Sequence, residues 1–175
     1  MSGSAGVLSA VSRETRGRLE VYADLLRKWQ PKINLIAPST LPDLWARHFE
    51  DSAQLLPLVP EGTTRIADMG SGGGFPGLVL AILTGIETHL VESDSRKCAF
   101  LREAARLTQA PVTIHTKRLE AMPALAADLV TARALAPLAD LLGYAARVGA
   151  ESGWQGLFLK GESWQNEVAA AQQTY

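Results

Sequence analysis

The sequence predicts a doubly wound α/β fold, in which a helical cap precedes a mostly parallel sheet. Beyond Gly62, short apolar segments alternate with helical segments, and this alternation is typical of a parallel sheet that is covered on both faces. Before Pro60, only the helical spacing of apolar residues is found. We therefore expect a helical cap over residues 1–62 and a core over residues 63–175, joined in a single globular unit.

The cap is expected to contain two helices. The first covers residues 12–29, because apolar residues recur there at helical spacing and Pro31 follows the end of the segment. The second covers residues 41–56, which carry one apolar stripe and are followed by Pro57.

The core is expected to contain five strands with helices between them. The strands are Arg65–Met69, Thr88–Glu92, Val112–Thr116, Asp128–Ala132 and Gly156–Lys160. The helices are residues 76–83, 94–108, 119–125 and 137–148, and a last helix begins near Ser163. No strand follows this last helix, so we expect that C-terminal strands of the sheet are missing from the chain.

Length and composition indicate a cytoplasmic globular protein. The 175 residues suffice for one domain with a full core, and no apolar segment has the length of a membrane span. The formal net charge of −1 shows no strongly basic tail, although a local basic patch would still allow RNA binding. Cys98 is the only cysteine and is interpreted as a packing residue; no His/Cys cluster has metal-binding spacing.

The segment ADMGSGGGFPG, residues 67–77, contains two overlapping ligand-binding patterns. Gly72–Gly77 fits the G-x-G-x-x-G fingerprint of dinucleotide-binding enzymes. Gly70–Gly74, preceded by Asp68, fits the G-x-G-x-G loop of enzymes that hold S-adenosyl-L-methionine. Pro76 favours the second pattern, because proline suits the first turn of a helix and so limits the loop to Gly70–Gly74. Gly77 then lies in the first helical turn, where it would allow close packing of the helix on the strand.

Two carboxylates near strand ends support the same choice. Asp68 would repel a pyrophosphate and attract the ammonium and sulfonium groups of S-adenosylmethionine. Glu92 ends the next strand, where a carboxylate can accept hydrogen bonds from both ribose hydroxyls. Nicotinamide cofactors use an acidic residue in the same way, so Glu92 does not discriminate by itself. A Rossmann-type oxidoreductase stays an alternative, as does a non-catalytic module that has kept the fold.

Further polar residues follow the later strands at the same sheet edge. Leu119 and Glu120 stand where the adenine of such a cofactor would lie, although Glu120 is equally explained as the start of a helix. Arg133 follows the fourth strand and could anchor a carboxylate or phosphate, or be a solvated surface residue. Lys160 ends the fifth strand.

The cap segment WARHFEDS adds two candidates. His48 shares a helical stripe with Trp45 and Phe49, which favours a partly buried core histidine held by a hydrogen bond over a direct chemical role. Arg47 and Asp51 have the spacing of a helical ion pair.

A set of motifs running from the first helix to the last residue is specific in combination: KINLIA, RHFEDSAQLL, ADMGSGGGFPGLVLAI, LVESDSRKCAFLRE, RLEAM, TARALAPL and FLKG. This set resembles the glucose-inhibited division protein B family, bacterial methyltransferases that modify a guanine at N7 in 16S ribosomal RNA. The resemblance implies a Rossmann-like class I S-adenosylmethionine-dependent fold. Asp68, Gly72 and Glu92 fit the wider methyltransferase pattern. The cofactor contacts that the resemblance itself implies are Gly70, Phe75, Leu119, Glu120 and Arg133.

The resemblance also implies the substrate, namely 16S rRNA within the 30S subunit or its precursor, on which a monomer would act. Guanine N7 is an exposed lone pair that carries no proton, so no general base is needed and catalysis rests on alignment. Arg47, His48, Arg133 and Lys160 are then candidates for phosphate or base contacts around the pocket. On the residues alone, a small-molecule class I methyltransferase stays the alternative.

Overall fold

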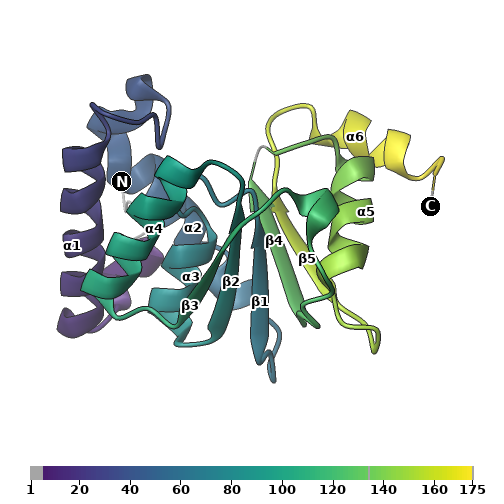
Figure 1. Cartoon of the computed structure of the whole chain (residues 1–175), viewed down its shortest axis with the longest axis horizontal. Helices are drawn as coiled ribbons and strands as arrows, with labels where there is room; N and C mark the ends of the chain where they lie inside the picture. The colour runs from purple at the N-terminus through teal and green to yellow at the C-terminus, as the bar shows by residue number, and fades with distance from the viewer. Residues whose placement is uncertain (1–5, 134, 175) are drawn as a thin grey trace, which may run out of the picture.

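The computed structural model describes residues 6–133 and 135–174 and shows one parallel five-stranded sheet of order β3-β2-β1-β4-β5 (Figure 1). The predicted strands are confirmed to within one residue at each end. They are β1 (Arg65–Met69), β2 (Glu87–Glu92), β3 (Val112–Thr116), β4 (Leu129–Arg133) and β5 (Gln155–Leu159).

The path of the chain along the sheet reverses at β1, which pairs with both β2 and β4. The segments after β1 lead outward to β2 and β3, and the later segments lead outward in the other direction to β4 and β5. In such sheets, ligands bind outside the carboxyl ends of the strands at this point of reversal.

Helices cover both faces of the sheet, as predicted. The long helices are α1 (Arg13–Trp29), α3 (Gly77–Thr84), α4 (Ser95–Thr108), α5 (Leu138–Val148) and α6 (Trp164–Ala171). The α3 and α4 helices lie on one face with α1 packed outside them, whereas α5 lies on the other face beside α6 (Figure 1). Polar side chains set two of the starts, because Ser12 accepts a hydrogen bond at the beginning of α1 and Asp94 does so at the beginning of α4.

Two predicted helices are wrong in length or kind. Residues 41–56 do not form one α-helix but a series of short turns, in which the only α-helical element is three residues long. The series is η2 (Pro38–Asp43, 3-10), η3 (Trp45–Glu50, π-helical), α2 (Asp51–Ala53) and η4 (Leu56–Leu58, 3-10). Pro42 lies inside η2 and lacks the N–H that an α-helix needs.

The predicted helix 119–125 is likewise reduced to one 3-10 turn, η5 (Leu119–Ala121). Met122 is extended, with ψ of 137°, because the ring of the following Pro123 disfavours the helical conformation in the residue before it.

The main hydrophobic core joins the cap to the sheet. Tyr22, Phe49 and Phe100 are fully buried and belong to one cluster with residues of α3 and β2. A second cluster lies under α5 on the opposite face. Among the described residues, no helix combines the length and apolarity needed to cross a membrane.

Candidate functional site

The conformation of the glycine loop confirms the G-x-G-x-G register. Gly70, Gly72 and Gly74 have φ values of 66°, 54° and 98°, a region that side chains disfavour. Gly72 and Gly74 belong to both registers, but Gly70, which only this register requires, has positive φ, whereas Gly77, which only the other register requires, does not. The α3 helix begins at Gly77, one residue after Pro76 and the cis Phe75–Pro76 peptide bond.

Gly77 packs directly on the strand, as expected. A Cβ atom built on Gly77 would lie 2.4 Å from the Cβ atom of Asp68 in β1. Gly73 is equally confined by the cap, because a Cβ atom there would lie 2.9 Å from the carbonyl oxygen of Leu35. The loop is therefore held between the sheet on one side and the cap on the other.

Asp68 lies behind this loop, and its side chain does not reach the ligand side. The carboxyl group is fully buried, its Oδ1 accepts a hydrogen bond of 2.7 Å from the Thr131 hydroxyl, and burial raises its pKa to about 6. Its Oδ2 has no hydrogen-bond partner within residues 6–133 and 135–174. The geometry therefore corrects the expectation that this carboxylate directly attracts a cationic ligand.

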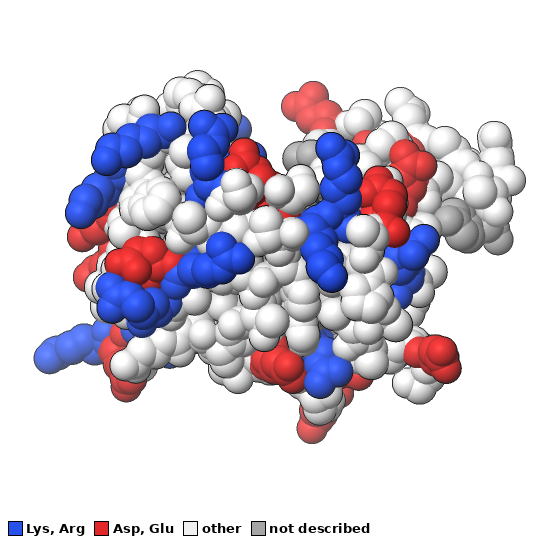
Figure 2. Space-filling model, in the orientation of Figure 1, with Lys and Arg blue, Asp and Glu red and all other residues white. Residues whose placement is uncertain are grey.

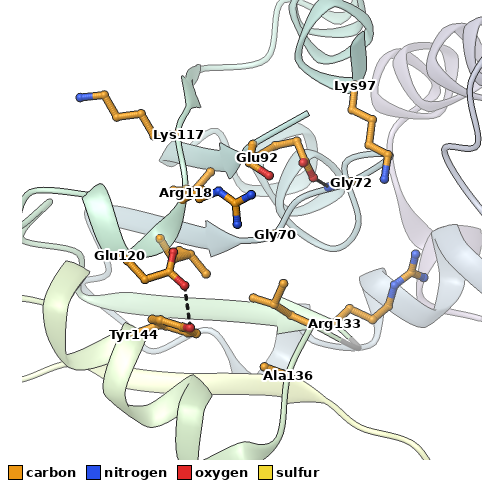
Figure 3. A pocket seen from close by; sticks show the side chains of 14 residues that line it. Gly70, Gly72, Glu92, Lys97, Lys117, Arg118, Glu120, Arg133, Ala136 and Tyr144 are labelled. Carbon is orange, nitrogen blue, oxygen red and sulfur yellow. Dashed lines mark hydrogen bonds between the residues drawn. The ribbon is translucent and has the colours of Figure 1, made fainter. Parts of the chain in front are cut away.

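A cavity of about 410 Å³ opens at the carboxyl ends of the strands, next to the point of reversal (Figure 3). Its volume lies within the range of small-molecule sites. The loops that follow β1, β2, β3 and β4 all contribute to its wall. The structure thus brings together six predicted site residues: Gly70, Gly72, Glu92, Leu119, Glu120 and Arg133.

Glu92 is held in place by main-chain groups from two loops. Its Oε2 accepts from the Gly72 N–H at 2.9 Å, and its Oε1 accepts from the Asp94 N–H at 2.8 Å. Each carboxylate oxygen can accept a second hydrogen bond. Glu92 therefore fits the predicted role of binding a pair of ribose hydroxyls.

Tyr144 of α5 also lines the cavity, although the sequence analysis missed it. Its hydroxyl donates a hydrogen bond of 2.9 Å to Glu120, as the dashed line in Figure 3 shows. The backbone N–H of Glu120 and the Tyr144 hydroxyl hold the pKa of Glu120 below its usual range. No local pattern marks Tyr144, because only the packing of α5 brings it to η5.

Arg133 extends from β4 away from the centre of the cavity (Figure 3), and its guanidinium group contacts His48 of the cap. Its Nη1 lies 2.8 Å from the Nδ1 of His48, and its Cζ lies 5.2 Å from the centre of the Phe75 ring. The Nε2 of His48 lies 2.7 Å from the Thr40 hydroxyl. His48 is buried, and burial followed by the charge of Arg133 lowers its pKa to about 4. The prediction of a core histidine held by hydrogen bonds is thus confirmed.

Phe75, Lys160 and Arg47 lie outside the cavity wall. The Phe75 ring is 2% exposed and stacks with Tyr22 in the core. Lys160 donates to the Ala136 carbonyl at 2.7 Å and pairs with Glu167. Arg47 is exposed and does not form the predicted pair with Asp51. The cofactor contact of Phe75 and the phosphate or base contacts of Arg47 and Lys160 stay predictions.

Basic side chains that the sequence analysis did not single out complete the site. Lys97, Lys117 and Arg118 line the cavity, and none of them forms an ion pair with a described residue. In Figure 3, Lys97 and Arg118 point toward the cavity and Lys117 extends away from it. Figure 2 shows Lys and Arg side chains over the upper and middle parts of the drawn face, with acidic side chains among them. The position of Lys117 and Arg118 directly after a strand could have identified them.

Comparison with known proteins matches residues 16–175 to the GidB family, described as rRNA small subunit methyltransferase G. A ribosomal RNA small subunit methyltransferase G of Paramagnetospirillum magneticum is 60% identical over 93% of this chain and 79% of that relative. The protein of the same name from Parvibaculum lavamentivorans is 55% identical over 99% of this chain and 79% of its own length.

Solved structures confirm the fold class. A ribosomal protein L11 methylase of Lactobacillus delbrueckii subsp. bulgaricus has a TM-score of 0.60 at 18% identity, over 73% of this chain and 67% of that chain. A TehB-like SAM-dependent methyltransferase of Corynebacterium glutamicum has a TM-score of 0.56 at 16% identity, over 90% of this chain and 83% of that chain. At such low identity these likenesses concern the fold alone.

Proposed function

The chain belongs to the rRNA small subunit methyltransferase G family, and from this premise we propose that it transfers a methyl group from S-adenosylmethionine to N7 of a guanine in 16S ribosomal RNA. The observation that carries the proposal is the carboxylate of Glu92, held between two loops in a cavity beside a G-x-G-x-G turn. This arrangement suits the ribose of a nucleoside cofactor, and the family match supports methylation of small-subunit rRNA.

Different residues of the cavity bind different parts of the cofactor. Glu92 accepts hydrogen bonds from the two ribose hydroxyls, and Glu120 accepts a hydrogen bond from the amino group of the adenine. Leu119 packs against the base. Gly70 and Gly72 allow the main chain to approach the ligand closely, because no side chain stands in the way. When bound, S-adenosylmethionine supplies a methyl group on a positively charged sulfur, which makes that carbon electrophilic.

The transfer needs alignment rather than proton abstraction. Guanine N7 presents a lone pair without a proton, so the chain has to place the base in line with the methyl group and the sulfur. Because N7 lies in the deep major groove of a paired helix, the guanine must be flipped out or lie in an open part of the RNA.

Lys97, Lys117 and Arg118 are proposed to contact RNA phosphates around this opening, because they bring positive charge that no described carboxylate pairs with. We further propose that the protein acts as a monomer, in the cytoplasm, on 16S rRNA in the 30S subunit or its precursor.

The test is methylation in vitro. The protein is incubated with S-adenosylmethionine and with either naked 16S rRNA or 30S particles that lack the modification, and the digested RNA is analysed by mass spectrometry. We expect N7-methylguanine with the wild type and its loss with Glu92→Ala. No N7-methylguanine with either RNA, together with retained cofactor binding, would favour a small-molecule methyltransferase. Binding of NADH without binding of S-adenosylmethionine would favour an oxidoreductase.

A further inference from the structure

We propose that Thr40 and His48 are positioning residues, which hold Arg133 through a neutral hydrogen bond so that its positive charge stays available for the carboxylate of the methyl donor. This inference rests on the proposed function, because it assumes a donor with an amino-acid carboxylate. It assigns the cap a part in cofactor binding that goes beyond packing.

The contacts of His48 define which ring nitrogen carries the proton. A guanidinium group has only donors, so the Nδ1 of His48 must accept the hydrogen bond of 2.8 Å from Arg133. The ring proton is then on Nε2, which donates to the Thr40 hydroxyl at 2.7 Å. Thr40 in turn donates its own proton to the Ala37 carbonyl at 2.7 Å. Each ring nitrogen of His48 therefore has one role, Nδ1 as acceptor and Nε2 as donor, and the ring is neutral.

The neutrality of His48 matters because Arg133 has no ion-pair partner among the described residues, and the carboxylates of Asp51 and Asp68 act on its charge only from a greater distance. Arg133 is half-buried, and no carboxylate of the described residues lies within ion-pair distance of it. Buried charges are ordinarily paired with a group of opposite charge. The contacts of Arg133 are an imidazole and the Phe75 ring, so its guanidinium group can still bind an anion. A carboxylate at position 48 would orient Arg133 equally well but would cancel its charge.

The position of Arg133 favours the cofactor over the RNA as the source of that anion. Arg133 lines the same cavity as Gly70 and Glu92 and lies partly under the cap, whereas a phosphate of a folded RNA meets exposed side chains first. A small ligand whose ribose is held by Glu92 can extend its amino-acid end along the glycine loop toward Arg133.

The irregular segments of the cap are what bring this pair of residues to Arg133. Thr40 lies in the 3-10 turn η2, and His48 lies in the π-helical turn η3. Adjacent His48 and Phe49 are both buried, and Phe49 is fixed by edge contacts with Tyr22 and Phe75. Single π-helical turns often occur at functional sites, and here the turn directs His48 toward β4 and the next residue, Phe49, into the core.

The first test uses two variants that each retain one half of the imidazole. In His48→Asn the amide oxygen stands near the position of Nδ1 and keeps an acceptor for Arg133. In His48→Gln the polar group stands near Nε2, so the contact with Thr40 is kept and the acceptor for Arg133 is lost. Calorimetry compares two ligands: S-adenosylhomocysteine, which has the carboxylate, and 5′-methylthioadenosine, which lacks it.

We expect His48→Gln to weaken S-adenosylhomocysteine binding about 10-fold, as the loss of one charged hydrogen bond predicts, and to leave 5′-methylthioadenosine unaffected. His48→Asn should lose less affinity than His48→Gln. His48→Asp should also weaken S-adenosylhomocysteine about 10-fold, because the ion pair with Arg133 removes the free charge.

Several results would overturn the inference. Equal losses for both ligands would mean that His48 acts only through packing. An unchanged affinity for S-adenosylhomocysteine with a raised KM for RNA would assign the anion to the RNA. If the wild type binds neither nucleoside, the proposed function itself fails; if only the variants behave otherwise than expected, the function stands and the role of His48 falls.

A second measurement uses the wild-type protein and therefore does not depend on whether the variants fold. Nitrogen-15 NMR of the wild-type histidines reports which ring nitrogen is protonated. The inference requires His48 to be neutral at pH 7 with its proton on Nε2. A proton on Nδ1, or a charged ring, would exclude a hydrogen bond accepted from Arg133 and refute it.

Discussion

The substitution Gly77→Ala tests how the glycine loop is joined to the sheet. The new Cβ atom would lie 2.4 Å from the Cβ and 2.6 Å from the Cγ of Asp68, both on a fully buried side chain. Carbon atoms in contact ordinarily stand about 3.5–4.0 Å apart, so the separation must increase by about 1 Å. Asp68 lies in β1, which pairs on both sides, so α3 has to move instead.

Such overpacking costs about 1–3 kcal/mol, which for a chain of this length corresponds to a fall in Tm of about 2–12 °C. Urea and thermal unfolding followed by circular dichroism would measure it. Gly17→Ala is the matched control: it lies within α1 with nothing within 4 Å of the added Cβ, so we expect about 0.5–1 kcal/mol of added stability. A Gly77→Ala protein as stable as the wild type would refute the close packing of α3 on β1.

Three further predictions concern charge and hydrogen bonding. Burial raises the pKa of Asp68 from 3.8 to about 6, so this carboxyl binds more protons in the folded state between these values, and its own contribution to stability should fall by about 3 kcal/mol as pH rises through them. His48, whose pKa is lowered to about 4, contributes in the opposite direction over a similar pH range, so the test compares the wild type with Asp68→Asn. Asp68→Asn should gain stability relative to the wild type between about pH 4 and pH 7, as urea unfolding at the two pH values would measure, and a difference between the two proteins that does not change with pH would contradict the assignment. Tyr144→Phe removes the hydroxyl that orients Glu120, so calorimetry should show weaker binding of S-adenosylhomocysteine but little change for its inosine analogue, which lacks the amino group. Equal losses for both ligands would mean that Glu120 does not accept a hydrogen bond from the adenine amino group. Lys117→Ala should reduce the salt dependence of RNA binding by about 0.7 in the log–log slope, whereas Arg13→Ala at the start of α1 should not, and identical slopes would remove Lys117 from the RNA surface.

Much of the fold and part of the site could be predicted from local patterns. The strand positions follow from short apolar segments between turn residues, and the G-x-G-x-G register follows from Pro76, which places the start of a helix. Glu92 could be predicted because the carboxyl ends of parallel strands meet at one edge. All of these inferences use residues that are close in sequence, where backbone geometry leaves few alternatives.

The failures have a common origin in contacts between distant segments. Whether residues 41–56 form one helix depends on how Phe49 and His48 are buried together against the core, and a helical period cannot encode the π-helical turn that results. Asp68 was expected to face the ligand, but a position at the end of a strand does not say on which side of the glycine loop the carboxylate lies.

The sequence alone therefore determined the class of fold, the edge of the sheet where a ligand binds and the register of the loop that approaches it. Only the tertiary structure decided which side chains share the site. His48 and Arg133 are 85 positions apart and Glu120 and Tyr144 are 24 apart, yet each pair forms a hydrogen bond. The physical reason is that periodicity reports which face of an element is buried, whereas the partner of a buried polar group depends on the packing of whole elements against one another.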